Sequence, residues 1–254
     1  MEKRYTGDMI YKKLPIVLLS TMASEKNDST NYLIASYLLA HKETAGDLKI
    51  TELAERCHVG TGSVSRFVRD IGLSGYHELS VLLKEDFQLP VMEEETPERI
   101  CDEILSASRA LDQKKINELC RAIRENGSVA AFGLLKAQAP VIMLQADLLM
   151  QKKLIITKTA YADQLQYLRD ASLDDLILIF SFSGAYFDYP DVRALKRKLD
   201  QMNIWMIGSG KCPSFIHHHL FYPSDLSSAS HPWQLMIAAE QIAVTYQKMY
   251  NEKD

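Results

Sequence analysis

The chain has 254 residues, of which 47% are hydrophobic and 24% charged, and its formal net charge at pH 7 is -4. These proportions are those of a globular protein with a sizeable core, and the length suits one large or two ordinary domains. The charge gives no global sign of a nucleic-acid partner, and no apolar run reaches the roughly 18 residues of a membrane span.

The first third of the chain is predicted to be helical, because residues 1–88 contain no convincing strand pattern. Two prolines then frame an acidic run, which predicts a linker over residues 89–96. Thr96 followed by Pro97 is typical of a helix start, and we expect helices over 97–111 and 114–125. The predicted domains are therefore 1–88 and 97–254, joined by that linker.

From residue 128 the hydrophobic period changes to short apolar runs that alternate with helical stretches. We expect helices near 137–151, 161–171, 189–202, 212–218 and 232–250. This alternation predicts a five-stranded, doubly wound parallel sheet covered by helices on both faces. The expected strands are Val129–Phe132, Leu154–Thr157, Leu176–Phe182, Ile204–Ile207 and Leu220–Tyr222.

Residues 50–72 have the pattern of a helix-turn-helix. Two apolar stripes share the spacing i, i+3, i+4, i+7: Ile50, Leu53, Ala54, Cys57 and then Val64, Phe67, Val68, Ile71. Gly60 lies in the short turn between them, and Gly72 is expected to end the second helix.

The outward face of the second helix is suited to DNA. Its hydroxyl groups could bond phosphates and its arginines could reach phosphates or guanine in the major groove. An ordinary helical bundle with a solvated face is the alternative, because residues 1–88 hold 11 Lys+Arg against 12 Asp+Glu and have no basic excess. The candidate DNA-binding residues are Thr61, Ser63, Ser65, Arg66 and Arg69.

This segment resembles the N-terminal domain of the RpiR/MurR family of bacterial transcription regulators. The resemblance rests on Leu53-Ala54, Val59, the run from Thr61 to Phe67, Ile71-Gly72 and Gly75-Tyr76. Gly60 stands where the family usually has serine, which removes one possible hydroxyl–phosphate contact. The family's second half is a sugar isomerase (SIS) domain with a flavodoxin-like sheet, and residues 97–250 resemble one. The resemblance implies a homodimer or higher homo-oligomer, paired through the SIS domain.

In such a sheet, ligands bind beyond the carboxyl ends of the strands, where loop N–H groups can hold phosphate. The loop after the first strand reads Gly133-Leu134-Leu135-Lys136-Ala137, where the SIS pattern is Gly-x-Gly-x-Ser. Leucine and alanine thus replace the second glycine and the serine. Lys136 could supply a positive charge instead, or be an ordinary surface lysine.

The second loop, Ser181-Phe182-Ser183-Gly184-Ala185-Tyr186, keeps three of the four defining positions of Ser-x-Ser-Gly-x-Thr. Tyr186 replaces the threonine. The third loop, from Gly208, offers Ser209, although an ordinary strand-to-helix turn would read the same way. The candidate effector-binding residues are Gly133, Lys136, Ser181, Ser183, Gly184, Tyr186 and Ser209.

No cofactor, metal or catalytic group is predicted. The four cysteines are spread without a CxxC pair, which suits a reducing compartment and small buried side chains. His217, His218 and His219 are expected to lie on a helix, where consecutive side chains diverge and cannot converge on one ion.

These observations favour a cytoplasmic transcription regulator that binds a palindromic operator in double-stranded DNA. Its SIS domain would bind a sugar phosphate or sugar-derived effector and so control carbohydrate metabolism genes. Two alternatives stay open: a SIS domain that is only a dimerisation scaffold, or a sugar-phosphate isomerase. The isomerase would need an acid and a base at the sugar ring, and no loop supplies a convincing glutamate.

Overall fold

The computed structural model describes residues 14–85, 96–225 and 230–250. The chain divides into two compact units, of which the first is Met1–Val91 together with Thr159–Leu165. The second is Met92–Lys158 together with Gln166–Asp254. Apart from Thr96, the predicted linker lies outside the described residues, so the domain boundaries drawn from the sequence stay a prediction.

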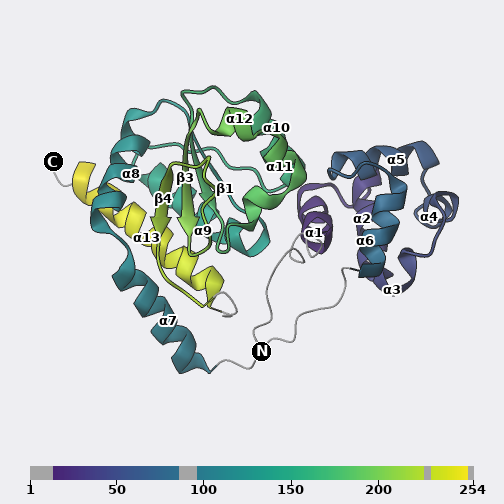
Figure 1. Ribbon diagram of the computed structural model, residues 1–254, viewed down its shortest axis with the longest axis horizontal. Coiled ribbons are helices and arrows are strands. Elements are labelled where there is room, and N and C mark those ends of the chain that lie inside the picture. The colour runs from purple at the N-terminus through teal and green to yellow at the C-terminus, as the bar shows by residue number, and fades with distance from the viewer. Residues whose placement is uncertain (1–13, 86–95, 226–229, 251–254) are drawn as a thin grey trace. The chain divides into compact units, whose positions relative to one another are not determined.

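The first unit is helical, as predicted, and its described residues contain no strand (Figure 1). Its helices are α1 (Leu14–Ser24), α2 (Thr30–Ala40), α3 (Lys42–Ala45), α4 (Ile50–Arg56), α5 (Thr61–Asp70) and α6 (Tyr76–Glu85). The stripes of α4 and α5 point inward and meet α2 and α6 in one core. Its fully buried side chains include Leu18, Ile34, Leu38, Leu53, Phe67 and Leu79.

Helices α4 and α5 end in the same hydrogen-bonded turn. After α4, the N–H of His58 bonds to the carbonyl of Glu55 and that of Val59 to Ala54. After α5, Gly72 and Leu73 make the equivalent bonds. One residue in each turn has the left-handed conformation, His58 after α4 (φ 55°) and Gly72 after α5 (φ 86°). This is the Schellman termination, in which glycine normally takes the left-handed position. The predicted role of Gly72 is confirmed, and His58 occupies the same position at a steric cost.

The second unit is an α/β fold. Its parallel sheet has the order β1-β2-β3-β4, from β1 (Val129–Phe132), β2 (Leu176–Phe180), β3 (Asn203–Gly208) and β4 (His218–Phe221). The other elements are α7 (Pro97–Ala110), α8 (Gln113–Glu125), η2 (Leu135–Ala137), α9 (Gln138–Met150), α10 (Tyr161–Asp170), η3 (Ala185–Asp188), α11 (Pro190–Ala194), α12 (Lys196–Leu199) and α13 (His231–Tyr250).

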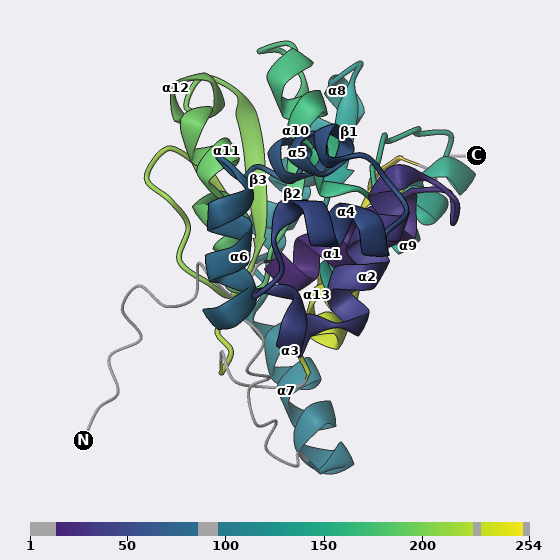
Figure 2. The same cartoon turned by 90° about the vertical axis from the view of Figure 1, so that its right-hand side faces the viewer.

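Helices cover both faces of this sheet. On one face, alternate strand residues form a core with α7, α8, α9 and α13 (Figures 1 and 2). On the other face, Phe132 of β1 packs edge-on against Tyr167 of α10, with ring centroids 5.2 Å apart. All nine residues of β1 and β2 are buried, which is what the uninterrupted apolar runs predicted.

The predicted second strand is reduced to a single bridge. Within Leu154–Thr157, Ile156 bonds to both Val129 and Ala131 on the free side of β1, each N···O distance being 2.8 Å. The sheet proper is therefore four-stranded rather than five-stranded. If this segment is counted as a strand and the strands are numbered along the chain, their order across the sheet is 2-1-3-4-5. This is the flavodoxin-like order that the sequence predicted.

Two helix predictions need correction. The segment predicted as a helix over 212–218 turns at Pro213 and passes into β4, which begins at His218. The helix predicted over 189–202 is divided into α11 and α12 at Leu195. In both places bonds between residues three apart replace the regular helical ladder, namely Ile216 to Pro213 and Lys198 to Leu195.

The histidine run therefore lies at a strand rather than on a helix, and its side chains still diverge. His218 stacks on Trp205, while the His219 ring bonds to the carbonyl of Gly208 at 2.9 Å. Among the described residues, no group of three metal-binding side chains is placed to share an ion. Within the same ranges, no helix is long and apolar enough to cross a membrane.

The cysteines agree only in part with the buried positions expected of them. Cys57 and Cys120 are buried, and burial raises their pKa values to about 11 and about 12, which leaves both thiols protonated at neutral pH. Cys101 is exposed, contrary to expectation, because it faces outward from α7.

Candidate DNA-binding and effector sites

The five predicted DNA-binding residues all lie on α5. Thr61, Arg66 and Arg69 are exposed, while Ser63 and Ser65 are half-buried. The remaining face of α5 carries the core residues Val64, Phe67 and Val68. The helix therefore presents hydroxyl and guanidinium groups outward and is fixed from behind.

The start of α5 leaves room for a close partner. Gly60 is its N-cap and, lacking a side chain, supplies no capping hydroxyl. A Cβ atom added at Gly62 would meet no atom within 4 Å. The first turn therefore has exposed backbone N–H groups and little side-chain bulk, which suits approach to a phosphate or a base edge.

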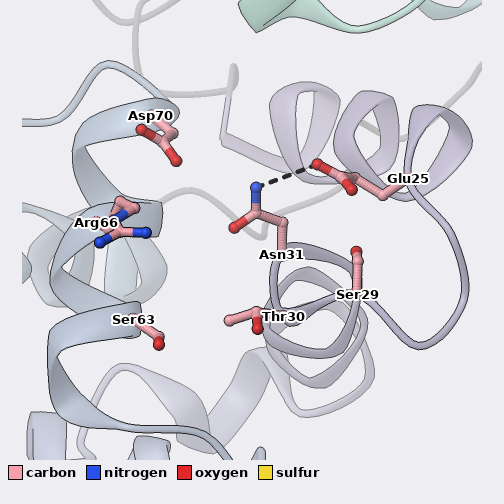
Figure 3. Close-up of a pocket in the computed structure, with 7 residues that line it drawn as sticks. All are labelled: Glu25, Ser29, Thr30, Asn31, Ser63, Arg66 and Asp70. Atoms are coloured by element: carbon pink, nitrogen blue, oxygen red, sulfur yellow. Dashed lines mark hydrogen bonds between the residues drawn. The ribbon is translucent and has the colours of Figure 1, made fainter.

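Arg66 also borders a pocket of about 210 Å³ that the sequence did not predict. Figure 3 shows Ser63, Arg66 and Asp70 on the α5 side, facing Thr30 and Asn31 at the start of α2. The hydroxyl of Ser29 caps α2 by accepting from the Tyr32 N–H, and Asn31 donates to Glu25 at 3.1 Å. The capping signal of Ser29 is readable in the sequence, but its place opposite Arg66 follows only from the fold.

Tyr76, part of the family-like tail after α5, has a structural role. Its hydroxyl donates to the carbonyl of Leu48 at 2.9 Å, which ties α6 to the segment before α4. Burial, with smaller contributions from nearby Glu52 and Cys57, raises its pKa to about 12.

The candidate effector residues lie in three loops at the carboxyl edge of the sheet. With the order 2-1-3-4-5, the strand order reverses between β1 and β2, so the loops after these strands flank the topological switch point. Gly133 and Lys136 follow β1, Ser181 to Tyr186 follow β2, and Ser209 follows β3.

The loop after β1 is tightly turned. A Cβ atom at Gly133 would collide with the carbonyl oxygen of Ala137, so glycine is required there. Leu135, which replaces the second glycine of the SIS pattern, has φ 49°. This left-handed conformation is one that glycine adopts freely, and it costs leucine about 1 kcal/mol. Lys136 is exposed.

The loops after β2 and β3 are joined backbone to backbone. The N–H groups of Ser209 and Gly210 both donate to the carbonyl of Phe182, at 2.9 and 2.6 Å. Side chains at Gly208 and Gly210 would collide with the backbone of Ser181 and Ser183. Ser209 thus lies directly beside the Ser181–Gly184 run, as the prediction of one shared site requires.

The hydroxyls of the second loop are engaged within the loop. The Ser181 Oγ accepts from the Tyr186 N–H at 3.3 Å, and the Ser183 Oγ accepts from Ala185 at 3.4 Å. Gly184 has φ 80°, and a Cβ there would press on the Lys211 carbonyl. The serines therefore shape the cradle, and each still has a hydroxyl proton to donate.

Tyr186 is buried rather than open to solvent, with 3% of its surface exposed. Its ring packs against Phe187, and burial raises the pKa of its phenol. Neither its hydroxyl nor that of Ser209 has a hydrogen-bond partner among the described residues. Buried polar groups are normally paired, so each of these hydroxyls has hydrogen-bonding capacity that the described residues leave unused.

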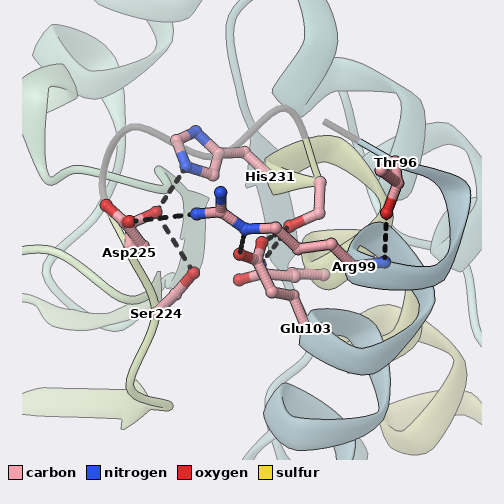
Figure 4. A network of polar contacts seen from close by, with 8 residues as sticks. Thr96, Arg99, Glu103, Ser224, Asp225 and His231 are labelled. Carbon is pink, nitrogen blue, oxygen red and sulfur yellow. Dashed lines mark hydrogen bonds and ion pairs between the residues drawn. The ribbon is translucent and has the colours of Figure 1, made fainter. Parts of the chain in front are cut away.

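A polar network beside the second loop was missed by sequence reasoning. Figure 4 shows Arg99 and Glu103 of α7 meeting Asp225 and the first residue of α13, His231. The His231 ring stacks on Phe182 with centroids 3.3 Å apart and planes inclined by 17°. Phe182 and His231 lie 49 positions apart in the chain, and the two α7 residues precede Asp225 by more than 120, so no local pattern could have indicated these contacts.

Comparison with known proteins agrees with both units. Residues 17–90 match the family model described as a helix-turn-helix domain, rpiR family. The regulator GlvR of Bacillus subtilis is 26% identical over 227 residues, covering 89% of this chain and 87% of GlvR. The regulator HexR of Pseudomonas aeruginosa is 26% identical over 193 residues, covering 65% and 63% of the two chains.

Solved structures resemble the fold. The NanR protein of Vibrio vulnificus, complexed with ManNAc-6P, has a TM-score of 0.53 at 16% identity and covers 94% of this chain and 93% of its own. The sugar isomerase domain of an RpiR transcription factor from Sphaerobacter thermophilus has a TM-score of 0.51 at 14% identity. That match covers 61% of this chain and 89% of the domain.

The match of residues 17–90 and the similarity to GlvR and HexR identify a transcriptional regulator, made of a helix-turn-helix domain followed by a domain of the SIS fold. Its DNA-binding domain belongs to the rpiR family of helix-turn-helix domains.

Proposed function

We propose that this protein binds a palindromic operator as a homodimer and controls genes of carbohydrate metabolism in the cytoplasm. We further propose that its effector is a sugar phosphate or another sugar derivative. One observation carries the proposal: the same chain has an exposed helix-turn-helix face and, at the switch point of its sheet, loops whose tight turns require glycine. NanR, which shares the fold, was solved with a sugar phosphate, ManNAc-6P.

The DNA contact is assigned to α5. Thr61, Ser63 and Ser65 lie on its outward side to bond phosphate, and Arg66 and Arg69 carry its positive charge. Because the unit has no basic excess overall, binding depends on this one face rather than on a general positive field. Arg66 and Arg69 should therefore account for much of the affinity.

Replacing both arginines tests the DNA assignment. The Arg66→Ala, Arg69→Ala variant should lose at least tenfold in affinity for an operator at fixed salt, and its salt dependence should become shallower. A matched control removes the same charge elsewhere, by Arg109→Ala with Arg121→Ala, both exposed in the other unit. Equal affinities of the two variants would remove the assignment of α5.

The effector is assigned to the edge formed by the three loops. Ser183, Ser209 and Tyr186 offer hydroxyls, the tight turns at Gly133 and Gly184 shape the loops, and Lys136 can reach an anionic group from the rim. The Ser209 and Tyr186 hydroxyls support a polar ligand most directly because they lie buried with no described partner.

Thermal unfolding with a panel of sugar phosphates and sugar acids tests this. A ligand at one hundred times its Kd stabilises by about 2.7 kcal/mol, which for a domain of this size raises Tm by roughly 5–10 °C. Ser209→Ala should fold normally and lose at least tenfold in ligand affinity, whereas Ser106→Ala on the outside of α7 should change neither. If no compound raises Tm at millimolar concentration, the SIS domain serves as a scaffold only.

Pairing is proposed through an apolar stripe on the second unit. Ile142, Leu149 and Met150 project from α9 with 49%, 55% and 85% of their surface exposed, and Leu154 beyond it is 65% exposed. An uncharged stripe of this kind is typical of a protein–protein contact. We propose that a second copy of the chain covers this stripe, because a palindromic operator with two half-sites is bound by a dimer.

Regulation is favoured over isomerase activity. A carboxylate and an imidazole, Glu103 and His231, do lie in one network beside the second loop. The Glu103 carboxylate, however, bonds to Arg99 and to Ser230. These bonds hold it as an ion-paired structural group rather than as a base free to abstract a proton.

A further inference from the structure

A continuous series of contacts connects the second effector loop to α7. It begins at Phe182, whose ring lies face to face with that of His231. The His231 Nε2 lies 2.9 Å from the carbonyl oxygen of Asp225 (Figure 4). The carboxylate of Asp225 lies 3.5 Å from Nη2 of Arg99, in the first turn of α7.

A second set of contacts joins Ser230, the residue before α13, to α7. The Ser230 hydroxyl donates to the Glu103 carboxylate at 2.5 Å, and Arg99 Nε lies 3.4 Å from the same group. Ser230 is fully buried, and the Glu103 side chain is only 19% exposed. Polar groups in such surroundings are expensive to leave half-paired, so the network is expected to hold or release as a unit.

We propose that this α7–α13 network, defined by Phe182, His231, Asp225, Arg99, Glu103 and Ser230, couples occupancy of the second loop to the N-terminal end of α7. The inference rests on the proposed function, which makes that loop the effector site. Phe182 is well placed to report a ligand, because its carbonyl holds the third loop while its ring holds α13. A ligand that rearranges either loop changes the stack.

The position of α7 in the chain explains how this coupling could affect DNA binding. Thr96 caps the helix by accepting from the Arg99 N–H at 3.3 Å, and the residues before Thr96 lead back to the DNA-binding unit. The helix turn that carries Arg99 therefore lies close in the sequence to the residues that connect the two units. An effector can regulate only through an element whose arrangement differs between bound and free states, and we assign that role to this network.

Amide hydrogen exchange on the full-length protein tests the proposal without a ligand. Phe182→Leu should raise exchange of the α7 amides at residues 100–104 at least fivefold, while α8 amides, which report global unfolding, stay within twofold of wild type. Phe187→Leu is the matched control, because Phe187 lies in the same loop but packs on Phe215 rather than on His231. Equal effects of both variants on α7, or none from Phe182→Leu, would overturn the proposal.

The same coupling can be tested in the reverse direction by hydrogen exchange, with a substitution at a half-exposed side chain that should not disturb folding. Coupling free energies act equally in both directions, so Arg99→Ala, at a side chain 48% exposed, should raise exchange in residues 181–186 at least fivefold. Arg109→Ala in the last turn of α7 should leave that loop within twofold of wild type. If both variants act alike, the effect is general loosening of α7 and the proposal fails.

DNA binding separates this proposal from the proposed function. A duplex is first selected from a random library by the wild-type chain; if none is selected, the proposed function fails while the exchange result stands. With a selected duplex, Phe182→Leu and Arg99→Ala should each change its affinity by about fivefold or more, the lower end of typical coupling. Unchanged affinity in both, beside intact coupling in exchange, would overturn the regulatory role of the network.

Discussion

Replacing Gly62 by alanine separates what α5 needs in order to fold from what it needs in order to bind DNA. A Cβ atom at this position meets nothing within 4 Å, so the change introduces no clash inside the protein. Alanine is favoured over glycine in a helix by up to about 1 kcal/mol, and about half of that is expected in the first turn. For a domain of this size the gain corresponds to a rise in Tm of roughly 2–4 °C.

The same methyl group lies on the face that we assign to DNA. It separates the start of α5 from phosphates and base edges, and we expect affinity to fall about tenfold, or about 1.4 kcal/mol. Thermal unfolding and fluorescence anisotropy at fixed salt measure the two effects on one sample. Gly127→Ala, equally free of clashes but beyond α8, controls for the substitution itself. A variant that is more stable and binds DNA as well as wild type would refute the assignment of this face.

Further predictions concern helix ends, pH and assembly. Gly72→Ala should lower stability by about 1 kcal/mol and His58→Gly should raise it by a similar amount, both measured by chemical unfolding, because each position is left-handed. Burial lowers the pKa of His218 and His219 below the ordinary 6.5, so unfolding takes up protons and stability should decline as pH falls through 6.5; replacing both by glutamine should flatten that profile. Met150→Glu should shift the protein toward monomer in light scattering, and an unchanged mass would exclude the α9 stripe.

Local patterns predicted what depends on neighbours in the chain. The i, i+3, i+4, i+7 stripes of α4 and α5 are buried as expected, except for the half-buried Ile50, because a helix that buries one face must repeat apolar residues at its own period. The apolar run at 176–180 is a buried central strand for the same kind of reason. Gly72 and Thr96 mark helix ends through bonds to residues only a few positions away.

Features that depend on distant residues were beyond such reasoning. The segment 154–157 reads as a full strand, but only Ile156 engages β1, because pairing depends on the geometry of a neighbour rather than on propensity. The stack of His231 on Phe182 and the place of Asn31 opposite Arg66 arise from tertiary packing alone.

At Leu135 the sequence predicted the departure from the SIS pattern but not the backbone strain that accompanies it. The sequence places leucine where the SIS pattern has its second glycine. The backbone nevertheless keeps the left-handed conformation that glycine would take, at the cost of strain.

Operator affinity with and without an effector tests the account most directly. A duplex selected by the wild-type chain is titrated with protein in the presence of each sugar phosphate or sugar acid that raises Tm. The account predicts that at least one such compound changes operator affinity fivefold or more, and that Ser209→Ala lowers the response to it. If compounds bind and stabilise the protein while operator affinity stays the same for all of them, the second unit is not the regulatory site.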